Sequence, residues 1–337
     1  MTMPQLMRIL RLAQAGITHP FGDARAVTQA FPSAIPSTLS DPFLMCDDFD
    51  MPSPGIITNP DEYFVDWHPH RGQLVLSYFK TGIGRHADSM GNRETFSTPG
   101  LQWIIAGSGI EHAEGGGTPA GEEQQGFQIW INLPSKDKMM DPKYGTESPE
   151  SIPLRDLFPK DNGEGFSFTD SSRNDKCVAG NSLVRARLLS GSFDGHIGPV
   201  QSIAKVQILD LEVDAGGNYI HLLPQDMDTC MIYVYDGSMV VNNSEVAKLK
   251  DVVLFDTISS SDFGTKGFHV HVPADSSKGA KAMIFIGRKL NEPIAWRGPI
   301  VMNTQEEINQ CMREIRSGKF PPVRAPWDYR RIITKPH

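Results

Sequence analysis

Two stretches decide the fold, WHPHRG at residues 67–72 and TFSTPGLQWIIAGSGIEHAE at residues 95–114. Apolar residues between Gly-containing turns are typical of short β-strands. Each stretch also carries two metal-ligating side chains spaced two residues apart: His68 and His70, and His112 and Glu114. Residues two apart on a strand point to the same face of a sheet, so each pair can direct both side chains inward. Two such strands facing each other across a small barrel would bring all four together.

Three imidazoles and one carboxylate form a mixed nitrogen and oxygen donor set. Such a set suits iron, manganese, nickel, copper or cobalt better than calcium or magnesium, and zinc stays open. Four protein ligands leave an octahedral metal one or two positions for substrate and dioxygen. The alternative interpretation is two pairs of surface side chains without a metal.

A third pair, His269 and His271 in FHVHVP (268–273), has the same spacing. Its half of the chain offers no obvious second pair, since His221 stands alone. We therefore interpret His269 and His271 as strand or rim residues, with a second metal site as the alternative.

The strand pattern recurs along the rest of the chain. Further apolar or alternating runs bounded by turn residues are 42–46, 74–79, 127–134, 206–213, 231–241, 252–256 and 281–287. Residues 135–180 are polar and separate two halves of similar β design. One helix is expected near the C-terminal end, from a capping box at Thr304 and Glu307 to a stop at Gly318.

Composition narrows the class of protein. The chain has 337 residues, 39% hydrophobic and 21% charged, which suits a folded protein of roughly two domains. The 31 glycines and 25 prolines favour many short elements over a helical bundle or a coiled coil. The formal net charge of −8 argues against the basic field that direct nucleic-acid binding requires.

Cysteines and apolar runs suggest a reducing compartment and no membrane span. The four cysteines are far apart and form no CxxC motif: Cys46, Cys177, Cys230 and Cys311. No stretch reaches 18 apolar residues, so no spanning helix is expected. Residues 1–22 carry Arg8 and Arg11 but no acid, which is compatible with a mitochondrial presequence; an N-terminal strand or arm is the favoured interpretation.

Five motifs together resemble the pirin family: WHPHRG (67–72), RHADSMGN (85–92), LQWIIAGSGIEHAE (101–114), FQIWINLP (127–134) and GPIVMNTQEEINQ (298–310). The resemblance implies an all-β bicupin, two antiparallel β-barrels related to jelly rolls with a short C-terminal helix. The expected parts are an N-terminal arm (1–40), a metal-binding cupin (41–150), a linker or loop region (151–185), a second cupin without metal (186–300), and a C-terminal helix and tail (301–337).

The resemblance also implies a metal site and a chemistry. The family's ligand positions are His68, His70, His112 and Glu114 in this sequence. The family metal is usually iron, so Fe²⁺ is expected first, with Mn, Ni, Cu, Co or Zn as alternatives. Members resemble quercetinases, which open a flavonol ring with dioxygen and release carbon monoxide. The expected partners are therefore a flavonol-like substrate and dioxygen.

The resemblance and the residue chemistry together assign individual roles. Glu114 is the one carboxylate among the four candidate ligands, so we expect it to act both as ligand and as general base toward the substrate hydroxyl. His86 and Asp88 are candidates for contacts to a ligand histidine, with a solvated hairpin turn as the alternative. Four aromatic side chains are candidates for packing a flat substrate, each with core packing as the alternative: Trp67, Tyr78, Phe79 and Trp103.

Two positions depart from the family pattern. Leu74 stands where an acid is common two residues after HPHRG, which leaves Glu114 as the one carboxylate among the candidate ligands. Gly100 stands where an acid often precedes the LQW segment, and we expect it to alter the local turn.

A second class of function is implied as well. Pirins are described as redox-sensitive regulators that bind transcription factors through an iron-dependent surface. The expected location is then cytoplasmic or nuclear, with no membrane and no direct nucleic-acid contact. A storage or structural protein that kept only the fold is a third alternative.

Overall fold

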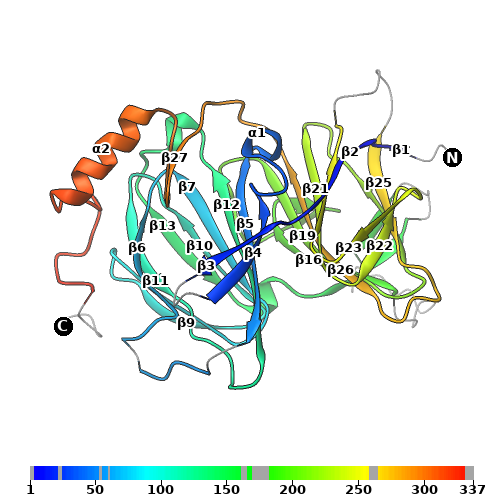
Figure 1. Cartoon of the computed structure of the whole chain (residues 1–337), viewed down its shortest axis with the longest axis horizontal. Helices are drawn as coiled ribbons and strands as arrows, with labels where there is room; N and C mark the ends of the chain where they lie inside the picture. The colour runs from blue at the N-terminus through cyan, green and yellow to red at the C-terminus, as the bar shows by residue number, and fades with distance from the viewer. Residues whose placement is uncertain are drawn as a thin grey trace. The chain divides into compact units, whose positions relative to one another are not determined.

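The computed structural model describes residues 4–21, 25–52, 55–59, 61–160, 165–168, 182–257 and 265–330. The chain divides into two compact units, each assembled from separate stretches (Figure 1). One unit comprises 17–29, 42–151 and 290–337, and we call it the HPH unit after residues 68–70. The other comprises 1–16, 30–41 and 152–289, and we call it the FHVH unit after residues 268–271.

The HPH unit is built from two sheets of antiparallel strands. The larger runs in the order β13 (Lys143–Glu147), β10 (Gly100–Ile105), β7 (Gln73–Phe79), β12 (Glu123–Asn132), β5 (Phe43–Pro52), β4 (Arg25–Phe31) and β3 (Ile17–Phe21). The smaller runs in the order β6 (Val65–His70), β11 (Ile110–Glu114), β8 (Ile83–Asp88) and β9 (Arg93–Ser97). These described strands form a jelly-roll-like pair of open sheets, and neither sheet closes into the barrel that the resemblance implies.

Alternation along β12 explains how the HPH unit is filled. Gln128 and Trp130 reach the interior, whereas Phe127 on the opposite face stacks on Tyr78 of β7. Both faces of this strand are buried over most of its length. The face that carries Phe127 is apolar there, and the face that carries Gln128 and Trp130 mixes polar and apolar side chains. Two apolar groups line the interior: Leu44, Val75, Ile104, Ile110 and Trp130, and Phe49, Phe64, Phe79 and Phe96.

The FHVH unit repeats the two-sheet design. Its larger sheet runs in the order β15 (Phe166–Phe168), β14 (Arg155–Pro159), β16 (Val184–Ser190), β19 (Val206–Val213), β26 (Ala280–Gly287), β21 (Thr229–Asp236), β24 (Asp251–Phe255) and β2 (Ile9–Gln14). Its smaller sheet runs in the order β1 (Gln5–Leu6), β25 (Lys266–His271), β22 (Ser238–Val241) and β23 (Glu245–Lys248), and β20 (Asn218–Leu222) also pairs with β25. One apolar cluster fills this unit and includes Leu209, Ile232, Val253, Phe268 and Ile284.

Short elements complete the described chain. They are α1 (Ser37–Ser40), two 3₁₀ turns (Ser135–Asp137 and Pro149–Ser151), the hairpin of β17 (Ser192–Phe193) and β18 (His196–Ile197), the hairpin of β27 (Ala295–Arg297) and β28 (Ile300–Met302), and α2 (Gln305–Arg316). None of the helices in the described residues is long and apolar enough to cross a membrane.

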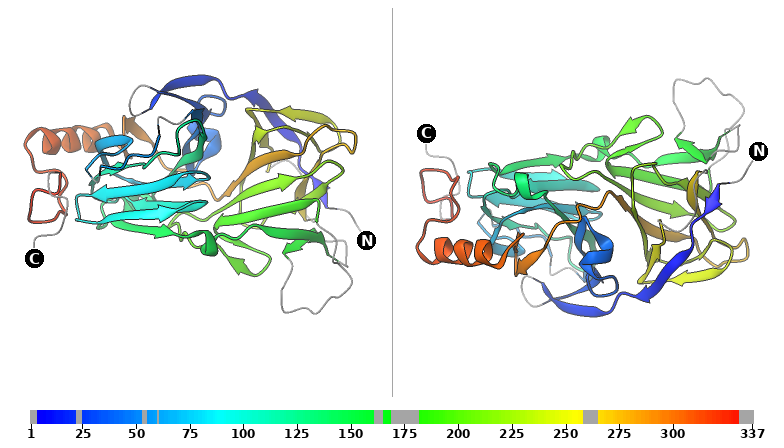
Figure 2. Two further views of the ribbon diagram at one scale, coloured as in Figure 1. Left: turned by 90° about the horizontal axis from the view of Figure 1, so that it is seen from below. Right: turned by 90° about the horizontal axis from the view of Figure 1, so that it is seen from above.

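The predicted C-terminal helix is confirmed as α2. The Thr304 hydroxyl accepts a hydrogen bond from the Glu307 backbone at 3.3 Å, and the Glu307 carboxylate accepts from the Thr304 backbone at 2.8 Å. Ile308 and Cys311 on its apolar face are fully buried. The helix runs along the outside of the HPH unit, next to β27 and β28 (Figure 2).

Two segments can be compared with the sequence patterns. Residues 9–14 form a strand paired with β24, in agreement with the N-terminal strand or arm that is the favoured interpretation. The described part of 151–185 carries β14 and β15, where the motifs predict a linker. Cys177 lies outside the described residues, and the other three cysteines are buried and not joined in disulfides.

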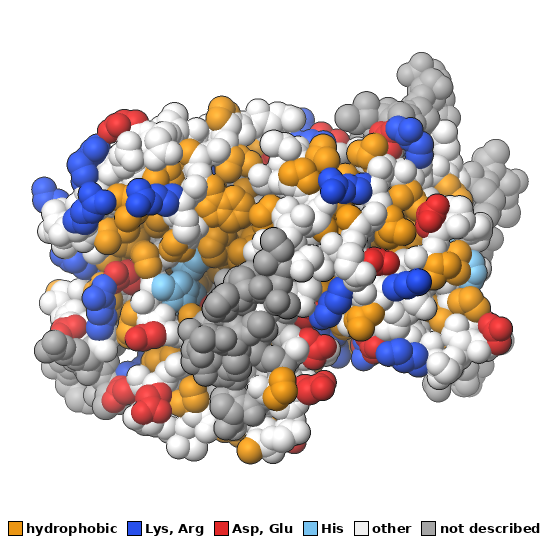
Figure 3. Space-filling view, viewed as in Figure 1, with side chains coloured by type: hydrophobic (Ala, Val, Ile, Leu, Met, Phe, Trp, Pro, Cys, Tyr) orange, Lys and Arg blue, Asp and Glu red, His pale blue; other side chains and the backbone are white. Residues whose placement is uncertain are grey.

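Surface charge is distributed over both units. On the face shown in Figure 3, several basic side chains gather at the upper left, and elsewhere basic, acidic and apolar side chains are interspersed.

A buried lysine, Lys138, ties the β28 segment to the rest of the HPH unit. The Lys138 ammonium is 1% exposed and donates to the carbonyl oxygens of Gly72 and Val301 at 2.8 and 3.1 Å and to Oδ1 of Asn132 at 2.6 Å. Burial lowers the pKa of Lys138 to about 8, against a smaller opposing effect of Glu292. The three acceptors satisfy all three donors of the charged form.

Replacing this lysine with an apolar side chain tests its role. We expect Lys138→Met to destabilise the protein, because each buried acceptor left unpaired costs about 1–3 kcal/mol. Between pH 8 and about 10.4 the unfolded chain holds a proton that the folded chain has lost, so the lysine makes wild-type stability rise with pH in this window. Denaturant unfolding of both proteins at pH 7 and pH 10 measures this, and an equal pH dependence in the two would contradict it.

Candidate metal centre

Three of the four predicted ligands meet in the interior of the HPH unit. β6 pairs with β11 in an antiparallel register that sets His68 opposite His112 and His70 opposite Ile110. Because residues two apart share a face, this register brings the three imidazoles together. Ring centroids lie 4.2 Å apart for His68 and His112, and His70 lies 5.0 Å from each. One nitrogen of each ring lies within 4.8 Å of the others.

Burial and hydrogen bonding prepare these rings to act as ligands. His68 is half-buried, and its Nδ1 donates to the Asp66 carbonyl oxygen at 2.7 Å, which leaves Nε2 with the lone pair. His70 and His112 are fully buried. Burial, reinforced by the neighbouring rings, lowers the pKa of both well below the usual range. Both are therefore neutral near pH 7, the form that binds a metal.

The unpaired nitrogens fit a transition metal. Within the described part of the chain, Nε2 of His70 and both ring nitrogens of His112 are buried and make no hydrogen bond. An unpaired buried polar atom costs about 1–3 kcal/mol, so several of them side by side require an explanation. Three converging imidazoles are a donor set for iron, nickel, copper or zinc.

Glu114 lies on the same strand, but its carboxylate is not part of the three-histidine group. A register irregularity after His112 places Glu114 opposite Val65 on β6. The side chain is 2% exposed, and the larger sheet holds its carboxylate. Oε2 accepts hydrogen bonds from Ser77 Oγ at 3.1 Å and from the Gln102 amide, and Oε1 accepts from Gln128 Nε2 at 2.6 Å.

The three donors around Glu114 are functional candidates that the motifs did not identify. Ser77, Gln102 and Gln128 belong to β7, β10 and β12, and all three are buried. A signal for them exists, because each is a polar residue that stands between two apolar neighbours along its strand. The sequence does not predict that these three side chains meet, since this depends on how three strands pair.

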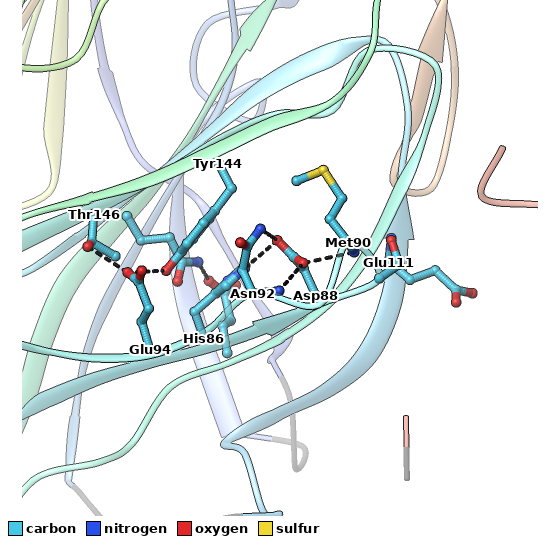
Figure 4. A network of polar contacts seen from close by, with 11 residues as sticks. His86, Asp88, Met90, Asn92, Glu94, Glu111, Tyr144 and Thr146 are labelled. Carbon is cyan, nitrogen blue, oxygen red and sulfur yellow. Dashed lines mark hydrogen bonds and ion pairs between the residues drawn. The ribbon is translucent and has the colours of Figure 1, made fainter. Parts of the chain in front are cut away.

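Sequence candidates His86 and Asp88 lie beside the histidines on β8 (Figure 4). Asp88 pairs directly opposite His112, and the His86 ring lies 5.7 Å from the His112 ring. His86 Nε2 lies 3.1 Å from Asp88 Oδ2, and the His86 ring stacks on Tyr144 at 3.8 Å. Both side chains are fully buried, so this pair supports one wall of the site and is not a solvated turn.

Asp88 also organises the turn that follows it. Its carboxylate accepts from the backbone N–H groups of Met90 and Asn92 at 2.9 and 3.0 Å, and from the Asn92 amide at 2.7 Å (Figure 4). Tyr144 donates its hydroxyl to Glu94 at 3.2 Å, and burial raises the Tyr144 pKa, so this hydroxyl stays protonated. The turn and the stacked tyrosine together fix the ring that packs next to His112.

A small cavity of about 10 Å³, room for about one water molecule, lies beside Glu114. Its apolar wall is formed by Phe49, Phe64 and Phe79. Its polar wall includes Glu114 and Gln124, and Gln124 Oε1 is buried with no hydrogen-bond partner among the described residues. The cavity is thus bordered by the Glu114 carboxylate and the unpaired Gln124 amide oxygen on its polar side and by aromatic side chains on its apolar side.

The four aromatic candidates from the sequence divide accordingly. Phe79 lines the cavity. Tyr78 points to the other face of β7, Trp103 donates to a carboxylate on β13, and Trp67 packs against the C-terminal segment. Of these four side chains, Phe79 is therefore the one that a substrate near Glu114 would contact.

The two departures from the family pattern have a structural setting. Leu74 is fully buried and alternates with the inward residues Gln73 and Ser77 of β7, so it points away from Glu114. Gly100 is needed by the turn before β10, because a Cβ there would lie 2.3 Å from the Ser97 carbonyl oxygen. Neither departure removes one of the four predicted ligands.

Two family models match the chain. The model described as Pirin matches residues 24–131, and the model described as Pirin C-terminal cupin domain matches residues 208–321. The chain belongs to the pirin family. A relative of this pirin-family chain in Pseudomonas aeruginosa, provisionally named quercetin 2,3-dioxygenase, is 32% identical over 311 residues, covering 89% of this chain and 94% of that protein. Human pirin is 30% identical over 281 residues, covering 83% of this chain and 82% of the human protein.

Solved structures agree with this assignment. A crystal structure of quercetin 2,3-dioxygenase from Acinetobacter baumannii superposes with a TM-score of 0.74 at 25% identity, covering 96% of this pirin-family chain and all (100%) of that chain. The pirin-family chain is therefore a bicupin of two cupin domains, with open sheets in each unit.

Metal content tests the three-histidine group. Protein refilled with Fe²⁺ under anaerobic conditions should hold about one iron per chain, and His112→Ala should lose it because one of three converging donors is gone. His196→Ala, in the FHVH unit, is the matched control and should keep the iron. Elemental analysis measures this, and an equal iron content in all three proteins would contradict it.

Proposed function

We propose that this protein is a metal-dependent dioxygenase of quercetin 2,3-dioxygenase type, with Fe²⁺ held by His68, His70, His112 and Glu114. The observation that carries the proposal is the convergence of three imidazoles, of which His70 and His112 have buried ring nitrogens without a hydrogen-bond partner among the described residues. A flavonol-like substrate is supported by the names of the Pseudomonas and Acinetobacter proteins described above.

A bound ion would act as a Lewis acid that lowers the pKa of a substrate hydroxyl and would hold substrate near dioxygen. The protein supplies the proton acceptor. Glu114 has its two carboxylate oxygens oriented by Ser77, Gln102 and Gln128, and each oxygen has more than one lone-pair site. We assign Glu114 the role of accepting the hydroxyl proton, because it borders the cavity where a substrate would meet it.

Phe64 is placed to limit the size of that substrate. Its backbone N–H donates to Gly115 at 3.0 Å, and a Cβ on Gly115 would lie 2.6 Å from Cβ of Phe64, so the side chain packs directly on the turn after Glu114. The cavity of about 10 Å³ is far smaller than the roughly 300–1,000 Å³ of ordinary ligand sites. A flavonol therefore requires side-chain movement, and Phe64 is the wall residue that packs on the turn directly after the base.

Oxygen uptake with quercetin tests the base. Glu114→Gln should reduce turnover by about 10²–10⁴-fold, because an amide cannot take the hydroxyl proton. Glu111→Gln is the matched control, since Glu111 lies on the same strand and bonds outward to Tyr329 and Arg330. Metal content measured in parallel separates loss of the base from loss of a ligand. Wild-type turnover in Glu114→Gln, or none in iron-loaded wild type, would refute the proposal.

Enlarging the cavity tests the size limit. Phe64→Ala should raise kcat/KM for quercetin by about tenfold, since relief of a pocket contact is worth about 1–3 kcal/mol. Phe96→Ala is the matched control, because Phe96 packs against Phe79 at 5.5 Å but does not line the cavity. Both variants should lose about 3–5 kcal/mol of stability, so activity is compared below their unfolding temperatures. An equal gain in kcat/KM in both variants would show that looser packing is responsible, and not the larger cavity.

A further inference from the structure

A second histidine pair lies on the outer face of a sheet in the FHVH unit. His269 and His271 alternate along β25 with Phe268 and Val270, which are fully buried in the core of that unit. Neighbouring residues on a strand point to opposite faces. The two histidines therefore share the face that is turned away from the core.

The inner face of the same sheet is occupied differently. β20 pairs with β25 in antiparallel fashion, as β6 pairs with β11 in the HPH unit. The inward pair on β20 is Tyr219 and His221, and Phe268 of β25 stacks on His221 at 5.2 Å. In the FHVH unit, aromatic packing thus fills the region that corresponds to the three imidazoles of the HPH unit. The outer pair, His269 and His271, is separate from that region.

The outer rings are close together, and one is already oriented. Their centroids lie 5.4 Å apart with planes at 25°, and His269 is 8% exposed whereas His271 is half-buried. Nε2 of His269 lies 2.6 Å from Oδ1 of Asn218. An amide oxygen can only accept, so Nε2 carries the proton and Nδ1 carries the lone pair.

Neither Nδ1 has a partner in the described fold. Among the described residues, Nδ1 of His269 and Nδ1 of His271 are buried and make no hydrogen bond. One nitrogen donating to an oxygen while the other keeps a lone pair is the usual arrangement around a metal-binding histidine.

We propose that His269 and His271 chelate a divalent transition-metal ion such as Zn²⁺, Cu²⁺ or Ni²⁺ on the outer face of β25. Imidazole pairs suit these ions and not Mg²⁺ or Ca²⁺. A shared ion lies in the plane of both rings, so the half-buried His271 turns to meet it and water completes the coordination. Asn218 is a positioning residue that holds the tautomer of His269. With only two protein ligands, this site is weaker than the three-histidine site.

Zinc binding to the full-length, chelator-stripped protein tests the proposal. Equilibrium dialysis should find about two zinc ions per chain, a tighter one lost in the triple variant His68→Ala/His70→Ala/His112→Ala and a weaker one lost in His269→Gln and in His271→Gln. His196→Gln, in the same unit, is the matched control and should keep both. Asn218→Ala should weaken the second zinc by about 10- to 100-fold, as expected for loss of an orienting partner.

The outcome is independent of the dioxygenase proposal. The triple variant His68→Ala/His70→Ala/His112→Ala removes every imidazole of the first site and isolates the weaker ion. Cu²⁺ bound to that variant should show imidazole nitrogen coupling by electron paramagnetic resonance, which adding His269→Gln abolishes. Far-UV circular dichroism confirms that each variant is folded. Retention of the weaker zinc with unchanged affinity in His269→Gln would overturn the proposal, as would a wild-type chain that binds a single zinc or a copper spectrum of the triple variant without nitrogen coupling.

Discussion

The antiparallel register between β6 and β11 is the constraint on which the site depends. Backbone hydrogen bonding sets His68 opposite His112 and turns His70 to the same side. Side chains alternate with a period of two, so a slip of one residue would send the imidazoles to the outer face and Trp67 and Pro69 to the inside. Burial of one face makes such a slip costly, and the apolar residue Ile110 opposite His70 helps to hold the register.

A polar interior imposes a second requirement, because every buried donor and acceptor needs a partner. The HPH unit meets it for Glu114 with a hydroxyl and two amides from the facing sheet, and for Lys138 with three oxygens. Among the described residues of this unit, unpaired buried atoms remain at several positions, and those of His70 and His112 are the ones that belong to the three converging imidazoles. Their convergence, and not the mere presence of unpaired atoms, distinguishes a site prepared for a ligand from an ordinary core.

The two units show how one topology supports different interiors. Each sets a strand carrying two inward side chains beside an antiparallel partner, β6 with β11 and β20 with β25. In the FHVH unit the partner strand contributes Phe268 and Val270 to the core, and its histidines alternate to the outside. The spacing H-x-H therefore does not reveal the face on which the pair lies, because both faces have the same period.

The sequence by itself determined most strands, the capping box of α2, the pirin resemblance and the pairing of His68 with His70 and His112 with Glu114, because these depend on spacing within a few residues. Only the tertiary structure decided which polar side chains surround Glu114, since Ser77, Gln102 and Gln128 come from strands far apart in the chain and meet through sheet pairing. It also decided that residues 9–14 join a sheet as an edge strand and that the sheets stay open. Local patterns record the alternation of a strand, whereas the choice of partner strand and of inner face is a long-range outcome of backbone pairing and burial.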